Sequence, residues 1–96
     1  MIIITGHIIA KPEHRDDVLT LSLEHCQRSR AEAGCLDHRL SEDQERPNHF
    51  TFLEYWQDYP SLKAHFALAE SQAFVKELRP LLAVDPDMNV FDAKAL

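Results

Sequence analysis

Along the 96 residues of the sequence, stretches with strand-like and helix-like hydrophobic spacing follow one another in the order strand, helix, strand, strand, helix, strand. Residues 2–10 are apolar and β-branched on both parities, which is typical of a strand covered on both faces. Residues 13–33 predict an amphipathic helix, because Val18, Leu21 and His25 share one stripe. The first third of the chain therefore predicts one strand and one long helix.

The middle of the chain predicts a β-hairpin. Leu36, His38 and Leu40 alternate with polar residues, as in a half-buried strand, and residues 45–48 form a turn. Residues 49–57 then alternate as a second strand. One face of this strand is expected to carry Phe50, Phe52, Glu54 and Trp56.

The last third predicts a helix in two pieces and a final strand. Asp58 or Ser61 is expected to cap a short helix that bears Leu62, His65 and Phe66. A further helix over residues 71–82 contains Pro80 in its last turn, which predicts an early end or a kink. Residues 88–93 are expected to form the last strand.

Two glycines mark positions with special backbone requirements. Gly6 lies inside the first predicted strand and indicates a β-bulge or a close approach of a neighbouring chain segment. Gly34 lies where the long helix needs a left-handed residue at its end.

This order of elements predicts an α+β protein of the ferredoxin-like class, an antiparallel sheet with helices on one face. Residues 1–96 are expected to form a single domain, since the chain is too short for two. The other sheet face is expected to carry Thr5, Ile9, Leu53, Tyr55 and Val90. A small domain rarely leaves such a face in water, so we expect a homodimer formed sheet against sheet.

Charge and cysteine usage narrow the classes of function. Sixteen Asp and Glu stand against ten scattered Lys and Arg, which disfavours nucleic acid and anionic membranes as partners. No long apolar run and no secretion signal occurs, so a cytoplasmic protein with Cys26 and Cys35 as thiols is expected. The sequence has no HxH, HxxxH or HExxH spacing and no glycine-rich phosphate loop, so neither a metal nor a nucleotide cofactor is expected.

Several short segments together resemble the antibiotic biosynthesis monooxygenase domain family. They are Gly34-Cys35-Leu36, Pro47-Asn48, Phe52-Leu53-Glu54-Tyr55-Trp56, Ala64-His65-Phe66 and Ala73-Phe74. The resemblance implies a dimeric α+β barrel. It also implies, among the activities of this diverse family, cofactor-free oxidation of a small phenol or quinol by dioxygen. Phe52 and Leu62 replace an Asn and a Tyr of polyketide-oxidising members, and residues 2–10 lack the Asn of haem-degrading members. The closest branch is therefore the quinol monooxygenase-like or uncharacterised one.

The resemblance and the residue types together give a candidate site. His65 is the expected general base, with Glu54 assisting, because an imidazole can accept a proton at neutral pH. Trp56, Phe52, Phe66 and His38 are the expected substrate-binding residues. Each position also has a structural interpretation, namely core packing for Trp56 and hydrogen bonds or ion pairs for Glu54 and His65. Three further histidines, His14, His25 and His49, are expected at the surface or its boundary.

Two other functions share the same fold. One is a non-catalytic small-molecule binding or stress protein, and the other is a haem-binding or haem-degrading protein in which His65 would be an iron ligand. Oxygen consumption with quinols, or a Soret band on adding haem, separates these alternatives from the cofactor-free monooxygenase.

Overall fold

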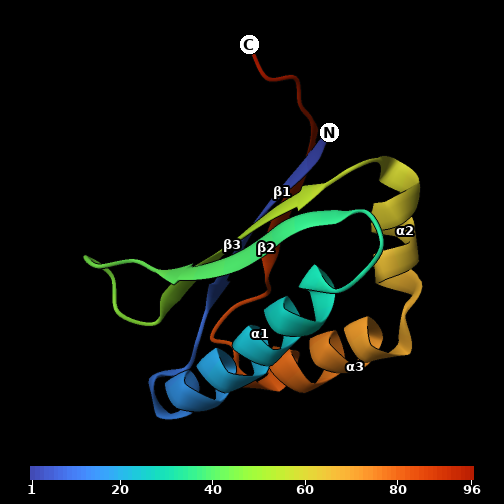
Figure 1. Ribbon diagram of the computed structural model, residues 1–96. Coiled ribbons are helices and arrows are strands. Elements are labelled where there is room, and N and C mark those ends of the chain that lie inside the picture. The colour runs from blue at the N-terminus through green and yellow to red at the C-terminus, as the bar shows by residue number, and fades with distance from the viewer.

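The computed structural model describes residues 1–96 and contains four strands, three α-helices and two short 3₁₀ helices (Figure 1). In chain order they are β1 (Ile2–Ile9), η1 (Pro12–His14), α1 (Arg15–Arg30), β2 (Cys35–Glu42), β3 (His49–Trp56), α2 (Tyr59–Ala67), α3 (Ala69–Leu78), η2 (Arg79–Leu81) and β4 (Asp87–Asp92).

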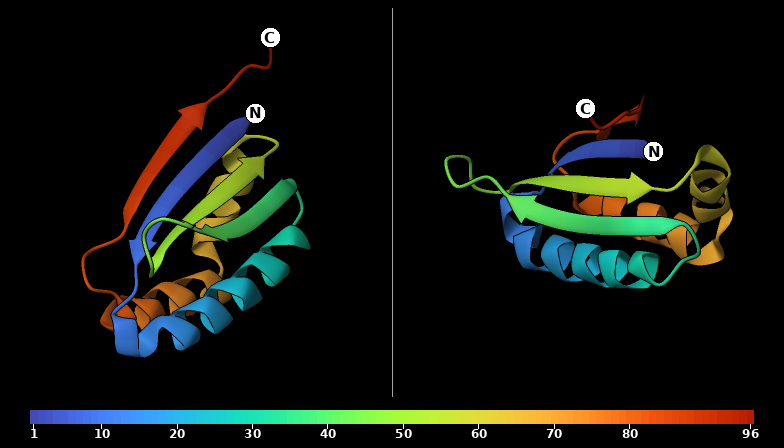
Figure 2. Two further views of the ribbon diagram at one scale, coloured as in Figure 1. Left: turned by 90° about the vertical axis from the view of Figure 1, so that its left-hand side faces the viewer. Right: turned by 45° about the horizontal axis from the view of Figure 1, so that its top comes forward.

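The four strands form one sheet in the order β2-β3-β1-β4, and every neighbouring pair is antiparallel. The helices lie on one face of this sheet, and α1 and α3 run side by side beneath it (Figure 2). This arrangement confirms the predicted ferredoxin-like α+β fold. The pairing of β1 with both neighbours continues across Gly6 without a bulge. A Cβ on Gly6 would lie 3.5 Å from Cβ of Phe52, so the glycine marks a close approach instead.

β3 follows its predicted alternation and supplies much of the core. Its inward side chains, Phe50, Phe52, Glu54 and Trp56, are all buried. Phe50 and Phe52 belong to a large apolar cluster under α1 and α3, whereas Trp56 packs with Ile4 and Leu62 in a smaller cluster under α2. Glu54 lies between them on the strand, so a polar site separates two apolar clusters.

β2 departs from its predicted alternation at one residue. Cys35 pairs with Trp56 and Asp37 pairs with Tyr55, so Leu36 is an extra residue in a β-bulge. The bulge leaves Leu36 58% exposed, although the alternation placed it on the inward face with His38. His38 and the residues after it keep the predicted phase.

The helix ends also differ in detail from the prediction. α1 ends at Arg30, earlier than the predicted boundary, so Gly34 is not its terminal left-handed residue. Gly34 does have a φ of +81°, but it belongs to the turn that leads into β2. Asp58 caps α2 through a hydrogen bond from the Ser61 backbone N–H, as expected. α3 starts at Ala69 and ends at Leu78, two residues before Pro80.

The outward face of the sheet carries four of the five predicted side chains. Thr5 pairs with Leu53 and lies on the same face as Ile9 and Tyr55. The expectation for Val90 was wrong, because it pairs with the buried Ile4 and therefore faces the helices. Phe91, which pairs with Ile3 on the outward face, takes its place and is 51% exposed.

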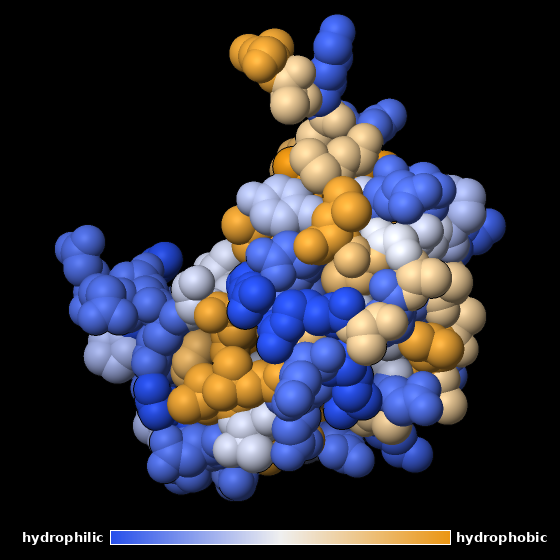
Figure 3. Space-filling view, in the orientation of Figure 1, coloured by the Kyte–Doolittle hydropathy of each residue, from blue (hydrophilic) through white to orange (hydrophobic).

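The view from the α1 and β2 side shows separate hydrophobic patches among hydrophilic side chains, and the end of the chain projects beyond the body (Figure 3). No helix is both long enough and apolar enough to cross a membrane.

Candidate functional site

A cavity of about 370 Å³ opens between the inward face of the sheet and α3. Its apolar walls include Phe52, Phe66, Phe74 and Met88, and its polar groups include His25, Glu54, His65 and Gln72. Four of the six predicted site residues, Phe52, Glu54, His65 and Phe66, therefore line one cavity. The other two, His38 and Trp56, are fully buried and lie behind the lining.

Three buried histidines from three different elements meet at the polar end of the cavity. His25 comes from α1, His38 from β2 and His65 from α2. Their ring centroids are 5.1 Å apart for His25 and His38, 5.2 Å for His25 and His65, and 5.7 Å for His38 and His65. The expectation that His25 lies at the surface or its boundary was wrong, since only 6% of it is exposed. The helical spacing that places His25 on the same stripe as the fully buried Val18 does indicate that His25 is buried.

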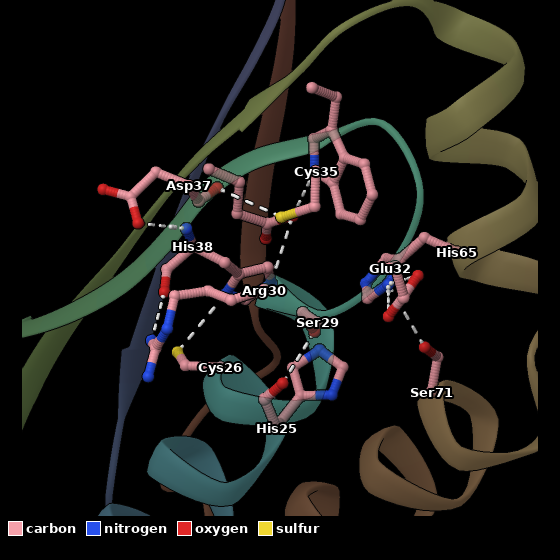
Figure 4. A network of polar contacts seen from close by, with 12 residues as sticks. His25, Cys26, Ser29, Arg30, Glu32, Cys35, Asp37, His38, His65 and Ser71 are labelled. Atoms are coloured by element: carbon pink, nitrogen blue, oxygen red, sulfur yellow. Dashed lines mark hydrogen bonds and ion pairs between the residues drawn. The ribbon is translucent and has the colours of Figure 1, made fainter.

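His65 is held from one side by a carboxylate that the sequence reasoning did not find. Both carboxylate oxygens of Glu32 lie 2.9 Å from Nδ1 of His65, and the Ser71 hydroxyl lies 3.5 Å from the same atom (Figure 4). Glu32 follows the end of α1, in a turn without a hydrophobic pattern to mark it. Since the carboxylate can only accept, it favours the tautomer with the proton on Nδ1 and leaves Nε2 with its lone pair.

His38 has one occupied and one unoccupied ring nitrogen. Its Nδ1 lies 3.2 Å from Sγ of Cys26, and Figure 4 shows the two residues side by side. Its Nε2 is 3.3 Å from Oε1 of Glu54, yet it has no hydrogen-bond partner of acceptable geometry. A buried nitrogen without a hydrogen bond is costly, so this atom needs a partner such as a water or an ion.

Glu54 is the carboxylate at the centre of the site. Its Oε1 accepts a 2.9 Å hydrogen bond from the Trp56 indole N–H. Burial raises the pKa of the Glu54 carboxyl, but its interactions with His38 and Trp56 outweigh burial and lower the pKa below its usual value. Trp56 also packs against His65 with ring centroids 4.7 Å apart. Trp56 therefore fixes both predicted catalytic side chains from behind the cavity.

The pKa of other buried groups follows from desolvation. Burial, aided by the nearby His38 and His65, lowers the pKa of His25 to about 3, so its imidazole is neutral at neutral pH. Burial raises the pKa of Cys26 and of Cys35 to about 11, so both remain thiols. Neither thiol has the character of a nucleophile.

Aromatic rings make up part of the apolar wall of the cavity, beside the aliphatic side chains of Ile8, Val75, Leu78 and Met88. His25 stacks on Phe74 at 4.0 Å with an interplanar angle of 4°, and Phe52 meets Phe74 edge to face at 6.1 Å. Phe66 is 41% exposed and lines the cavity. Such walls suit a flat aromatic molecule whose polar end reaches His65 and Glu54.

Comparisons with known proteins agree on one family. The family model described as "Antibiotic biosynthesis monooxygenase" matches residues 1–77. The protein "Putative monooxygenase YcnE" of Bacillus subtilis is 35% identical over 88 residues, which cover 92% of this chain and 93% of that protein. An uncharacterised protein of Synechocystis is 30% identical over 90 residues, 94% of this chain, and the chain spans 61% of its length.

Solved structures share the fold of this chain. A crystal structure from Deinococcus radiodurans, described as a "putative antibiotic biosynthesis monooxygenase", superposes with a TM-score of 0.95 at 29% identity. The match covers 100% of this chain and 95% of that one. A conserved protein from Methanosarcina mazei Go1 superposes with a TM-score of 0.92 at 25% identity, covering 97% of this chain and 92% of that one.

Proposed function

The chain belongs to the antibiotic biosynthesis monooxygenase family, and from that premise we propose that it oxidises a small phenol or quinol with dioxygen, without a cofactor. The observation that carries this proposal is the position of His65. Its imidazole lines a cavity with aromatic walls, and its Nδ1 is held by Glu32, 2.9 Å away. A proton acceptor therefore lies at the polar end of a site shaped for a flat ring.

The proposed reaction needs no external reductant. Nε2 of His65 takes the phenolic proton, and the electron-rich anion reduces dioxygen. One oxygen atom bonds to the ring carbon opposite the phenolic oxygen. The O–O bond then breaks, and the second oxygen leaves as water with the phenolic hydrogen and the hydrogen of that carbon. Phenol and dioxygen thus give quinone and water. In a quinol the opposite carbon already carries the second hydroxyl, so the oxygen bonds instead to a ring carbon beside a phenolic oxygen, and loss of water with the hydrogen of that carbon and a phenolic hydrogen gives a hydroxyquinone.

The remaining site residues have supporting roles in this proposal. Phe52 and Phe66 hold the ring and exclude water, which favours charge transfer to dioxygen. Glu54 stabilises positive charge that develops on the imidazoles. Trp56 and His38 act as positioning residues, because they lie behind the lining and contact Glu54.

The assembly is part of the proposal as well. We propose that residues 1–96 act as one domain and pair with a second copy through the outward face of the sheet. An exposed Phe91 and a 36% exposed Leu53 on that face support this arrangement. It would also place the cavities on the two outer sides of the dimer.

Oxygen uptake by metal-stripped protein with a panel of phenols and quinols tests the activity. The wild type should consume oxygen in proportion to protein concentration. His65→Gln should reduce the rate by about 100-fold or more, which is typical of losing a general base. His14→Gln is the matched control, because the His14 side chain makes no capping hydrogen bond to α1 and lies outside the cavity.

Two outcomes would contradict the proposal. Oxygen uptake no faster than autoxidation across the panel would show that the protein lacks the proposed activity. Full activity per folded molecule in His65→Gln would show that His65 is not the general base. Circular dichroism of each variant confirms that the comparison is made between folded proteins.

A further inference from the structure

We propose that His25, His38, His65 and Glu54 form a binding site for a divalent first-row transition-metal ion, with three imidazole nitrogens and one carboxylate oxygen as ligands. This inference goes beyond the proposed function, which uses no metal. It also revises the expectation from the sequence. The search for HxH or HxxxH spacing finds ligands on one strand or helix, whereas these histidines come from α1, β2 and α2.

The spacing of the three rings fits a tetrahedral ion. One ring nitrogen of each histidine lies within 4.8 Å of a nitrogen of each of the others. With metal–nitrogen bonds of about 2.0–2.1 Å, ring centroids in a tetrahedral site lie about 5.2 Å apart. The observed separations are 5.1, 5.2 and 5.7 Å. Binding of the ion would draw the nitrogens from within 4.8 Å to a ligand–ligand distance of about 3.3 Å.

Two ligand atoms already have the spacing that a shared ion requires. Nε2 of His38 is 3.3 Å from Oε1 of Glu54, which equals the edge of about 3.3 Å expected for a tetrahedral site with such bond lengths. His38 is fully buried, and this Nε2 has no hydrogen-bond partner. A cation placed between the two atoms would satisfy a nitrogen that is otherwise unpaired.

Two of the four ligands, His65 and Glu54, have the usual outer shell of a metal site. Ligating histidines in proteins almost always bond a carboxylate, carbonyl or water through the second ring nitrogen. His65 has Glu32 at 2.9 Å from Nδ1, and the Trp56 indole N–H donates to Glu54. Nδ1 of His38 faces Sγ of Cys26 at 3.2 Å. These contacts occupy Nδ1 of His38 and Nδ1 of His65, and they leave Nε2 of each ring for the ion.

One contact competes with the ion. Nη2 of Arg28 lies 3.5 Å from Nδ1 of His25, and an arginine can only donate. This contact favours the His25 tautomer whose Nε2 is protonated. Arg28 is exposed, however, and the distance is at the limit of a hydrogen bond, so its side chain can move into solvent when a metal binds.

The donor set indicates the class of ion. Imidazoles with one carboxylate suit Zn²⁺, Fe²⁺ and Co²⁺ rather than Mg²⁺ or Ca²⁺, which prefer oxygen ligands. The ion has a route to the site, because His25, Glu54 and His65 all line the open cavity. The ion would therefore sit at the polar end of the cavity, in contact with any bound substrate.

Co²⁺ titration of metal-stripped protein tests the site without any substrate. We expect one Co²⁺ per chain and the intense visible absorption bands of a four-coordinate ion. His25→Gln and His65→Gln should each weaken binding at least about tenfold. Glu54→Gln, which keeps the shape of the side chain, should weaken binding and alter the bands. Competition by Zn²⁺ should bleach the bands.

The matched control is His7→Gln. His7 and His49 form a second histidine pair on the outward sheet face, with Nδ1 of His49 3.2 Å from Nε2 of His7. His7→Gln should leave Co²⁺ binding unchanged. Binding that survives in both His25→Gln and His65→Gln, or that is lost in His7→Gln, would overturn the proposed site. So would the absence of any four-coordinate spectrum. Each of these results is independent of oxygen uptake, which is measured on metal-free protein.

Discussion

His65 is needed by both proposals through the same atom. Its Nδ1 contacts Glu32, so the Nε2 lone pair is the one that can accept a substrate proton or bind a metal, but not both at once. Glu54 is shared in the same way, since Oε1 faces His38 Nε2 at 3.3 Å and borders the cavity. Occupation by a metal and proton acceptance by His65 are therefore mutually exclusive.

We accordingly expect Zn²⁺ to inhibit substrate oxidation. Zn²⁺ has no redox chemistry of its own, so it should only block the base. One equivalent should abolish most oxygen uptake, and EDTA should restore it. His7→Gln should be inhibited like the wild type. Oxidation that continues at full rate in protein shown to hold Zn²⁺ would separate the two sites and contradict this overlap.

At this scale, the sequence predicted the residues of regular elements better than those of turns. The alternation in β3 placed Phe52 and Glu54 correctly, because a strand repeats every two residues. Glu32 could not be found, since no periodicity marks a turn residue as a partner of His65. The prediction for His25 was wrong although it shares a helical stripe with Val18, because burial keeps its imidazole neutral and so permits a position inside the protein.

At the scale of elements, one ion pair joins the start of α1 to the end of β2. Nε of Arg15 donates to Glu42 at 3.1 Å, and Nη2 donates to the other carboxylate oxygen. Glu42 also accepts from the Asn48 backbone N–H, so it connects the helix to the hairpin turn. The hydrogen bonds from Arg15, followed by the one from Asn48, lower the pKa of the Glu42 carboxyl.

This lowered pKa predicts a dependence of stability on pH. The contribution of Glu42 is fully present above its unfolded pKa of about 4.3, and it is lost as pH falls through the lower folded value. In Glu42→Gln, the free energy of unfolding should therefore fall less steeply as the pH decreases. The difference in slope from the wild type should correspond to at most about one bound proton. Urea unfolding from pH 7 down to pH 2.5 measures the slope.

The control for this experiment is Glu13→Gln, an exposed change in the short helix before α1. It should leave the slope unchanged. A slope in Glu42→Gln equal to that of the wild type would mean that the carboxylate has the same pKa in the folded and unfolded chains.

Element boundaries show where sequence reasoning ends. The predicted cap at Asp58 and the predicted early end of the helix before Pro80 are both confirmed. A capping side chain and a missing backbone N–H act on their immediate neighbours, so the local sequence is enough to predict them. The sequence did not predict the β-bulge at Leu36 or the sheet face on which Val90 lies. Both depend on which residues of the neighbouring strand lie opposite. Register is a property of the pairing, and a shift of one residue moves a side chain to the other face.

At the scale of the molecule, the sheet has helices on one face only (Figure 2). The outward face carries Leu53 at its centre, paired with Thr5 of β1 and Arg39 of β2. Every residue of β4 is exposed, and beyond it the chain projects from the body (Figure 1). A face of this kind favours association with a second copy rather than exposure to water.

The proposed dimer predicts the effect of a charge on that face. Leu53→Glu should weaken association by about 100-fold or more, because each dimer would bury two carboxylates without partners. Arg39, the neighbour in β2, is already held by Asp37 at 2.8 Å, so it gives the new charge little compensation.

Leu23→Glu is the matched control, since Leu23 is 49% exposed on α1, away from the outward face of the sheet. Sedimentation velocity over a range of concentrations should give a monomer for Leu53→Glu and a dimer for both the wild type and Leu23→Glu. A monomeric wild type would contradict the sheet-to-sheet assembly, and a dimeric Leu53→Glu would place the interface on another surface.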